Sequence, residues 1–271
     1  MSSARILKLI HALGMTANAK RLKKHLAKFG LWPKSGFGYG HRNDACHLLE
    51  GRGLEIGASH CPASLPARCK IEYCDAHSRQ ELEKLFPEIE PKLVVDVDHI
   101  VNLDEDSLDK KVAHPYDFVI INYVIEHVAN PLSVIEQLFG VIRPGGKLLI
   151  SAPNKEFKEF NFDKQRKLTS FDHLQEEYRQ GVIRVEDDHY LDFICHTAPA
   201  VFNSGDAEQI NAALMLLRDR REHAHVWNTE SFLDFLQQAL AFLYVDATLE
   251  YVSGASANNF ECFVVPKKVS G

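Results

Sequence analysis

The stretch YDFVIINYVIEHV, residues 116–128, joins a short run of apolar residues to a set of polar ones. The apolar part does not alternate with polar residues, which is typical of a parallel strand that is buried on both faces. Glu126 and His127 follow that strand, which ends at Asn122, and ligands of open parallel sheets lie beyond the carboxyl ends of the strands. The stretch therefore predicts a central strand with chemical groups at its end.

Similar runs lie on both sides of this stretch and alternate with helical segments such as 131–139. They are GLEIG (53–57), KIEYCD (70–75), KLVVDVD (92–98) and GKLLISAP (146–153). Two extended segments near the C-terminus, 242–252 and 259–266, flank a turn-rich loop and predict an antiparallel pair. The predicted fold is α/β, with a seven-stranded, mostly parallel, doubly wound sheet, an antiparallel C-terminal strand pair, N-terminal helices and a partly helical insertion after strand five.

The charge of the chain is divided unevenly. The formal net charge is −6, yet residues 1–43 carry nine Lys or Arg and no acid, which leaves −15 for the remainder. Such a basic arm suits a polyanion or a charged membrane surface, and it is also compatible with a solvated helical face. We expect residues 1–50 to form a basic N-terminal helical segment and residues 51–271 to form the main domain.

The composition excludes several protein classes. A hydrophobic content of 45% and a charged content of 25% exclude disorder, collagen-like fibres and disulfide-stapled miniproteins. Six cysteines without a CxxC pair are typical of reduced thiols. No apolar run reaches the roughly 18 residues of a membrane span, and the start does not resemble a signal peptide. We therefore expect a soluble, cytoplasmic protein with no transmembrane segment, and peripheral membrane contact stays open.

Acidic residues and a glycine stand at the predicted strand ends. Glu55 and Gly57 follow the first run, and Asp75 ends the second, at a distance along the chain close to that of ribose-binding acids. Asp96 and Asp98 end the third predicted strand, where a carboxylate could accept from an adenine amino group. Because the chain has neither a lysine-bearing phosphate loop nor a full GxGxxG, these residues favour an adenosine ligand without a pyrophosphate.

Five segments carry a resemblance to a known family. They are LEIGA (54–58), Asp75, VDVD (95–98), YDFVIINYVIEHV (116–128) and VIRPGGKLLISAPN (141–154). In this order and spacing the chain resembles the class I S-adenosylmethionine-dependent methyltransferases. The stretch 153–174 is also similar to bacterial methyltransferases associated with surface-glycan assembly.

The resemblance implies an enzyme with S-adenosylmethionine as cofactor. It implies that Glu55 and Gly57 face the methionine part of the cofactor, Asp75 the ribose, Asp98 the adenine and Asn122 the reactive side. The family's second and third glycines are replaced by Ser59 and Cys61. Ser59 is still expected at the cofactor, although its loop shape is put in doubt.

We predict that the insertion, residues 155–227, and the N-terminal helices build a pocket for the methyl acceptor, a hydroxyl of a saccharide or similar polar small molecule. His127 is the candidate base, because histidine titrates near neutral pH. The predicted acceptor contacts are Asn154, Arg166, Thr169, His173, His189, Tyr190, His223 and His225. HAH (223–225) and DDH (187–189) leave a metal as an alternative, but their spacing matches no recognised structural zinc pattern, so no metal ligand is assigned.

Two other functions stay open. An RNA or protein methyltransferase could use the basic arm to attract its substrate, although we do not expect nucleic-acid binding. A non-catalytic S-adenosylmethionine-binding partner protein would explain the two replaced glycines. The sequence indicates neither the identity of the acceptor nor the oligomeric state.

Overall fold

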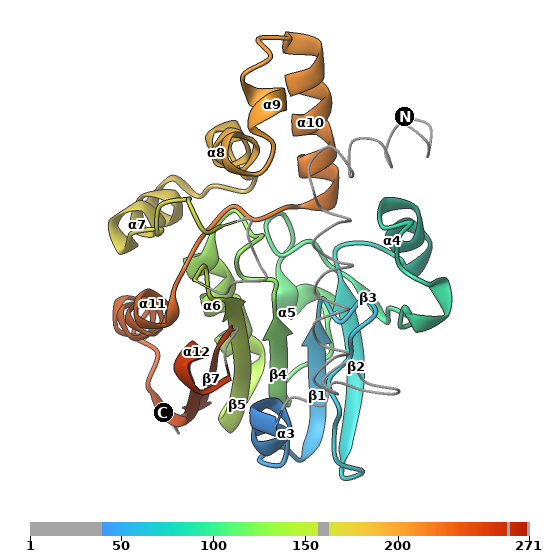
Figure 1. Cartoon of the computed structure of the whole chain (residues 1–271). Coiled ribbons are helices and arrows are strands. Elements are labelled where there is room, and N and C mark those ends of the chain that lie inside the picture. Colours follow the sequence, from blue (N-terminus) through green and yellow to red (C-terminus); the bar gives the residue numbers. More distant parts are fainter. Residues whose placement is uncertain (1–39, 157–162, 259–260, 270–271) are drawn as a thin grey trace.

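The protein has one seven-stranded sheet with the strand order β3-β2-β1-β4-β5-β7-β6 (Figure 1). The computed structural model describes residues 40–156, 163–258 and 261–269. β1 to β5 pair in parallel, and β7 is antiparallel to both β5 and β6, which confirms the predicted fold class. The strands are β1 Gly51–Ile56, β2 Cys69–Asp75, β3 His99–Ile100, β4 Tyr116–Asn122, β5 Ile142–Pro153, β6 Ala247–Ser253 and β7 Glu261–Lys268.

The central strand β4 is covered on both faces. Val119 and Ile121 belong to the core cluster that includes α6 (Pro131–Val141) and α11 (Thr229–Phe242). Phe118 and Ile120 point to the opposite face and pack with α3 (Gly40–Cys46) and Leu49. Since successive side chains of a strand alternate between faces, burial on both sides explains the unbroken apolar run.

Two caps place the helices that follow the strand ends. Asn130 accepts a hydrogen bond from the backbone N–H of Ser133 at 3.0 Å, and Pro131 occupies the first turn of α6. Asn228 and Ser231 form a reciprocal capping box at the start of α11. These side chains satisfy N–H groups that a helix cannot pair internally, so the loop after β4 ends at a fixed point.

The insertion is helical and has a core of its own. It contains α7 (Phe171–Gln180), α8 (Asp187–Thr197), α9 (Pro199–Phe202) and α10 (Ala207–Arg220). Tyr190, Phe193 and Leu217 are buried in its hydrophobic cluster. Figure 1 shows α8 to α10 beyond the carboxyl ends of the parallel strands. The segment 223–227 returns to the sheet, where Trp227 bridges to Asn154 and enters the main core.

The prediction of the third strand is wrong in its position. Pro91–Leu93 is a 3-10 helix, and β3 contains only His99 and Ile100. The Asp98 carboxylate accepts from the backbone N–H of Tyr73 at 2.8 Å, so that N–H is not available to a neighbouring strand. The backbone N–H of Asp98 donates to the carbonyl of Tyr73 at 2.9 Å, and the residues registered against β2 are His99 and Ile100. Asp98 thus precedes the strand that it was expected to end.

The predicted helices before residue 40 lie outside the described residues. Residues 40–49, on the N-terminal side of the expected domain boundary, pack on the sheet, and Arg42 forms an ion pair with the buried Glu261 of β7 at 2.5 Å. The remaining helices are α4 Arg79–Leu85, α5 Leu108–Lys111 and α12 Ala255–Asn258. Among the described helices, none has the length and hydropathy needed to cross a bilayer.

Candidate active site

Glu55 fixes the loop that follows β1. Its side chain is buried, and its two carboxyl oxygens accept from the backbone N–H of Ala63 at 2.9 and 3.1 Å. Burial raises the pKa of Glu55 to about 7, although the Ala63 hydrogen bond and the charge of Arg42 oppose the rise. The contacts of this side chain within the chain thus hold residues 57–63 in place at the end of the strand.

The loop after β1 keeps a glycine-like backbone without all the family's glycines. Gly57 has φ +72°, and a Cβ there would lie 2.3 Å from Cγ2 of Val124 in the loop after β4. Ser59 also adopts the left-handed region, with φ +45°, and its carbonyl accepts from the N–H of Val95 at 2.9 Å. A left-handed conformation costs an ordinary residue roughly 1–2 kcal/mol, so the surrounding contacts hold the loop in the shape that glycine would take freely.

Asp75 lies at the end of β2, where a ribose-binding acid is expected. Asp98 does not lie at the end of β3, where the adenine contact was expected. Asp75 ends β2, and its Oδ1 accepts from the N–H of His77 at 3.0 Å. Burial raises the pKa of Asp75. Asp98 is exposed beside Tyr73, before β3. The strand position on which its adenine role was predicted is therefore wrong.

The end of β4 contains polar groups and a strained residue. The Ser151 hydroxyl donates to Oδ1 of Asn122 at 2.9 Å. Tyr123, which follows, has φ +57°, and non-glycine residues in this region concentrate at functional sites. Asn122 also lines a narrow pocket, whose other lining residues are Arg42, Asn43, Cys46, Ala63, Ser64, Leu149 and Phe263.

Three buried side chains, Glu126, Asp163 and His223, and the partly exposed His127 form what we call the strand-end cluster. Glu126 is 1% exposed, and neither of its carboxyl oxygens receives a hydrogen bond from another residue in the described part of the chain. Burial raises the pKa of Glu126 to about 8, and the nearby charge of His223 limits the rise. A carboxyl group in this environment is mainly protonated at pH 7 and releases its proton slightly above it.

Two other members of the strand-end cluster, Asp163 and His223, hold opposite charges. His223 Nδ1 lies 2.7 Å from Oδ2 of Asp163. Burial alone would lower the pKa of His223, but Asp163 raises it to about 9. His127, whose ring packs edge-on to that of His223 with centroids 4.7 Å apart, has its pKa lowered by burial to about 3. His127 is thus neutral and a weak base, and Glu126 is the better proton acceptor.

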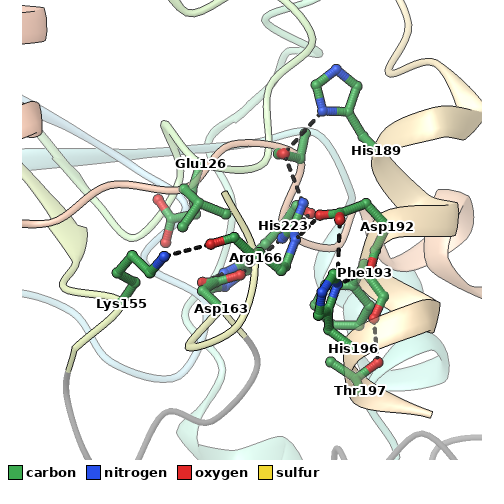
Figure 2. A network of polar contacts seen from close by, with 12 residues as sticks. Glu126, Lys155, Asp163, Arg166, His189, Asp192, Phe193, His196, Thr197 and His223 are labelled. Carbon is green, nitrogen blue, oxygen red and sulfur yellow. Dashed lines mark hydrogen bonds and ion pairs between the residues drawn. The ribbon is translucent and has the colours of Figure 1, made fainter. Parts of the chain in front are cut away.

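Arg166 binds Asp163 of this cluster. Figure 2 shows its guanidinium between Asp163 and Asp192, to which it donates at 2.8 and 2.6 Å. It also donates at 3.0 Å to the carbonyl oxygens of His223 and Ala224. Arg166 is only 2% exposed, and its guanidinium group is used in these contacts. It therefore does not face an acceptor as expected.

Other predicted acceptor contacts also serve the insertion itself. Thr169 and Val226 exchange two hydrogen bonds, and Tyr190 lies in the core of α8 and α10. Asn154 is 7% exposed in its bridge to Trp227. Thr169 and Asn154 were expected to contact an acceptor, but their observed contacts are with the distant residues Val226 and Trp227.

The structure brings His173, His189 and His225 together around a residue that was not predicted, Glu177. We call these four the three-histidine cluster. Nε2 of His173 and of His189 lie 3.0 and 3.2 Å from Oε1 of Glu177, and 3.3 Å from each other. The spacing of His173 and Glu177, four residues apart on a helix, is the signal in the sequence that could have indicated the pair. Glu126 and Asp163 were missed as well.

Comparison with known proteins places the chain in a family. Residues 37–239 match the family model described as a methyltransferase domain. The chain therefore belongs to the methyltransferase domain family, and S-adenosylmethionine is the cofactor of this class. The glycine-like loop after β1 and the acid at the end of β2 fit an adenosine-bearing cofactor.

Curated relatives match over short segments. An uncharacterized protein of Methanocaldococcus jannaschii is 31% identical over 110 residues, which are 41% of this chain and 48% of that protein. Ubiquinone biosynthesis O-methyltransferase of Vibrio cholerae is 39% identical over 49 residues, 18% of this chain and 20% of the relative. The matches thus span less than half of these relatives.

The solved structures that the chain resembles are distant. The N-methyltransferase NodS of Bradyrhizobium japonicum, in complex with S-adenosyl-L-homocysteine, is 12% identical with a TM-score of 0.40, covering 95% of this chain and 88% of NodS. An S-adenosylmethionine-dependent methyltransferase of Methanosarcina mazei is 15% identical with a TM-score of 0.41, covering 82% and 94%.

Proposed function

We propose that this protein transfers the methyl group of S-adenosylmethionine to a hydroxyl of a saccharide or similar polar small molecule, and that Glu126 accepts the hydroxyl proton. The observation that carries the proposal is the Glu126 carboxyl, which is buried just after β4, has a pKa of about 8 and has no hydrogen bond from another described residue. A buried carboxyl group with a pKa shifted in this way is a candidate for a functional group.

The cofactor would be held by the loops after β1 and β2. The backbone of Gly57 and Ser59 would follow the methionine part near Glu55, Asp75 would accept from the ribose hydroxyls, and Asn122 would face the reactive end. When bound, S-adenosylmethionine supplies a methyl group on a positively charged sulfur. We do not retain an adenine contact for Asp98, because it precedes β3.

The acceptor needs help with its proton. A hydroxyl keeps its proton tightly at neutral pH, and a well-placed base typically contributes about 10²–10⁴-fold to the rate. Glu126 titrates close to neutrality, so it can take the proton as the oxygen attacks the methyl carbon. The charge of His223, held by Asp163, would stabilise the ionised Glu126 carboxylate before the reaction. Glu126 would then receive the proton of the acceptor hydroxyl.

Two observations favour oxygen as the accepting atom. A relative over 49 residues is named as an O-methyltransferase. An amine acceptor would only have to arrive neutral and would not require a base, whereas the strand-end cluster provides one. A saccharide is favoured by the similarity of residues 153–174 to methyltransferases of surface-glycan assembly.

The test is incorporation of methyl label. Purified protein is incubated with S-adenosylmethionine labelled in its methyl group and with glycan, RNA, protein and small-molecule fractions of a cell extract. We expect label in the glycan or small-molecule fraction, with little dependence on salt. Label in RNA that falls steeply with salt would instead assign the basic arm to a polyanionic substrate. No label in any fraction, with intact cofactor binding, would favour the non-catalytic alternative.

A further inference from the structure

The three-histidine cluster presents several electron-pair donors to one point. The backbone carbonyl of Ala224 can only accept, and it lies 3.0 Å from Nδ1 of His189. Nδ1 therefore carries the proton, and Nε2 of His189 is left with a lone pair. That nitrogen faces Oε1 of Glu177 at 3.2 Å and Nε2 of His173 at 3.3 Å. Three such atoms in contact require a proton or a cation among them.

These three atoms have the spacing of ligands around a transition metal ion. The distances among Nε2 of His173, Nε2 of His189 and Oε1 of Glu177 are 3.0, 3.2 and 3.3 Å. Ligands bound tetrahedrally to zinc at roughly 2.0–2.1 Å lie about 3.4 Å apart. The three atoms thus form nearly one face of a zinc tetrahedron without any rearrangement of the backbone.

His225 stands at the fourth side of the cluster. One of its ring nitrogens lies within 4.8 Å of a ring nitrogen of both other histidines. Its Nε2 lies 3.0 Å from the carbonyl oxygen of Val128 and 3.8 Å from Oε2 of Glu177, and the carbonyl places the proton on Nε2. Its Nδ1 is buried and has no hydrogen-bond partner in the described part of the chain, and the same is true of Oε2 of Glu177.

The hydrogen bonds around the cluster are those of metal-binding histidines. Such histidines usually donate their second ring N–H to a carbonyl or carboxylate, which fixes the tautomer and the ring. Both His189 and His225 do so, to Ala224 and Val128. The ion would have a route of entry, because the side chain of His173 is 46% exposed.

We propose that His173, Glu177, His189 and His225 bind one zinc-like divalent transition metal ion, which joins α7 and α8 to the segment 223–227 above the sheet. Imidazole and carboxylate ligands suit this class of ion. Ligation by four protein groups is typical of a structural site. The ion would fix the segment that presents His223 to Glu126, and its binding does not depend on the cofactor or the acceptor.

The test is zinc binding by the intact chain after chelator treatment and dialysis. Calorimetric titration with Zn²⁺ should give one tightly bound ion per chain. His189→Ala and Glu177→Gln should each weaken binding by about 100-fold or more. Co²⁺ in place of zinc should give the intense visible absorption of four-coordinate cobalt in the wild type and lose it in both variants.

Matched controls separate this site from other ligands. His196→Ala changes an exposed histidine of the same helix α8, and Glu126→Gln changes the strand-end cluster without changing its shape. Both should bind zinc as the wild type does. His173→Ala, at a half-exposed position, provides a further test should Glu177→Gln fold poorly by circular dichroism. Absence of stoichiometric zinc binding to the wild type, or wild-type affinity in the His189 and His173 variants, would overturn the proposal and identify a proton-sharing network.

Discussion

Two buried glutamates, Glu126 and Glu177, lie among histidines on either side of the segment 223–225, and their environments act in opposite directions. Glu126 has no hydrogen bond from another described residue, and burial raises its pKa to about 8. Burial alone would also raise the pKa of Glu177, but hydrogen bonds with His173 and His189 lower it to about 2. Hydrogen bonding, rather than burial, therefore separates them.

The difference assigns different chemistry to the two groups. A carboxyl group that titrates near neutral pH can exchange a proton with a substrate. A carboxylate that stays ionised and is held in one orientation suits a cation. Two clusters of the same residue types can thus supply a base at the end of β4 and a metal site in the insertion.

Glu126→Gln gives the largest expected effect. It keeps the shape of the side chain and removes its ability to accept a proton, so the turnover number for methyl transfer to a hydroxyl acceptor should fall by about 10²–10⁴-fold. Affinity for S-adenosylhomocysteine should stay unchanged. Glu176→Gln, on the exposed face of α7, is the matched control and should retain full activity. Wild-type turnover in the Glu126 variant would exclude it as the base.

Arg166→Met tests the support of the strand-end cluster. The change removes the arginine partner of Asp163 and leaves this buried carboxylate paired with His223. It also removes the donor to Asp192 and to two buried carbonyl oxygens, so it should lower the free energy of unfolding by about 3–5 kcal/mol. Urea denaturation measures it. The exposed Arg184 is the control, and Arg184→Met should change stability by less than about 0.5 kcal/mol. Equal, small effects would show that Arg166 is free to serve an acceptor instead.

The pH dependence of stability should differ in sign between the two glutamates. The folded pKa of Glu177 is lowered, so its stabilisation is present above about pH 4.5 and is lost as the pH falls toward 2. The folded pKa of Glu126 is raised, so its contribution is present below about pH 4.5 and is lost as the pH rises through 8.

Urea denaturation of the glutamine variants at several pH values measures both effects. Glu177→Gln should be less stable than wild type at pH 7, by about 1 kcal/mol or more, and should approach it near pH 3. Glu126→Gln should gain stability relative to wild type between pH 5 and pH 9. A Glu126 variant whose relative stability does not vary with pH would contradict the raised pKa.

The sheet was predictable because its signal is local. The apolar run of β4 follows from burial on both faces, and the predicted start and end of this strand are confirmed. The third strand was misplaced because Val94, Val95 and Val97 have high β-propensity, whereas an edge strand depends on pairing, which begins only at His99. Propensity does not encode which N–H groups a neighbouring side chain occupies.

The insertion was predictable only as partly helical. Arg166 and Tyr190 are residue types that bind sugars, but their partners lie in distant segments, such as His223 and Leu217. Nothing in the sequence near Arg166 shows that these segments meet. Glu126 lies within the stretch 116–128. In the described part of the chain, both Glu126 and His127 have buried polar atoms without a hydrogen-bond partner. Only the effect of burial on the pKa, which is raised to about 8 in Glu126 and lowered to about 3 in His127, favours Glu126 as the base.

Calorimetric titration with S-adenosylhomocysteine tests most directly whether the carboxyl ends of β1, β2 and β4 hold S-adenosylmethionine. We expect one binding site per chain in the wild type and an affinity about 10- to 100-fold weaker in Asp75→Ala, because a charged hydrogen-bond acceptor is removed. A folded wild-type sample that shows no binding, or an Asp75→Ala protein that binds as tightly as wild type, would contradict it.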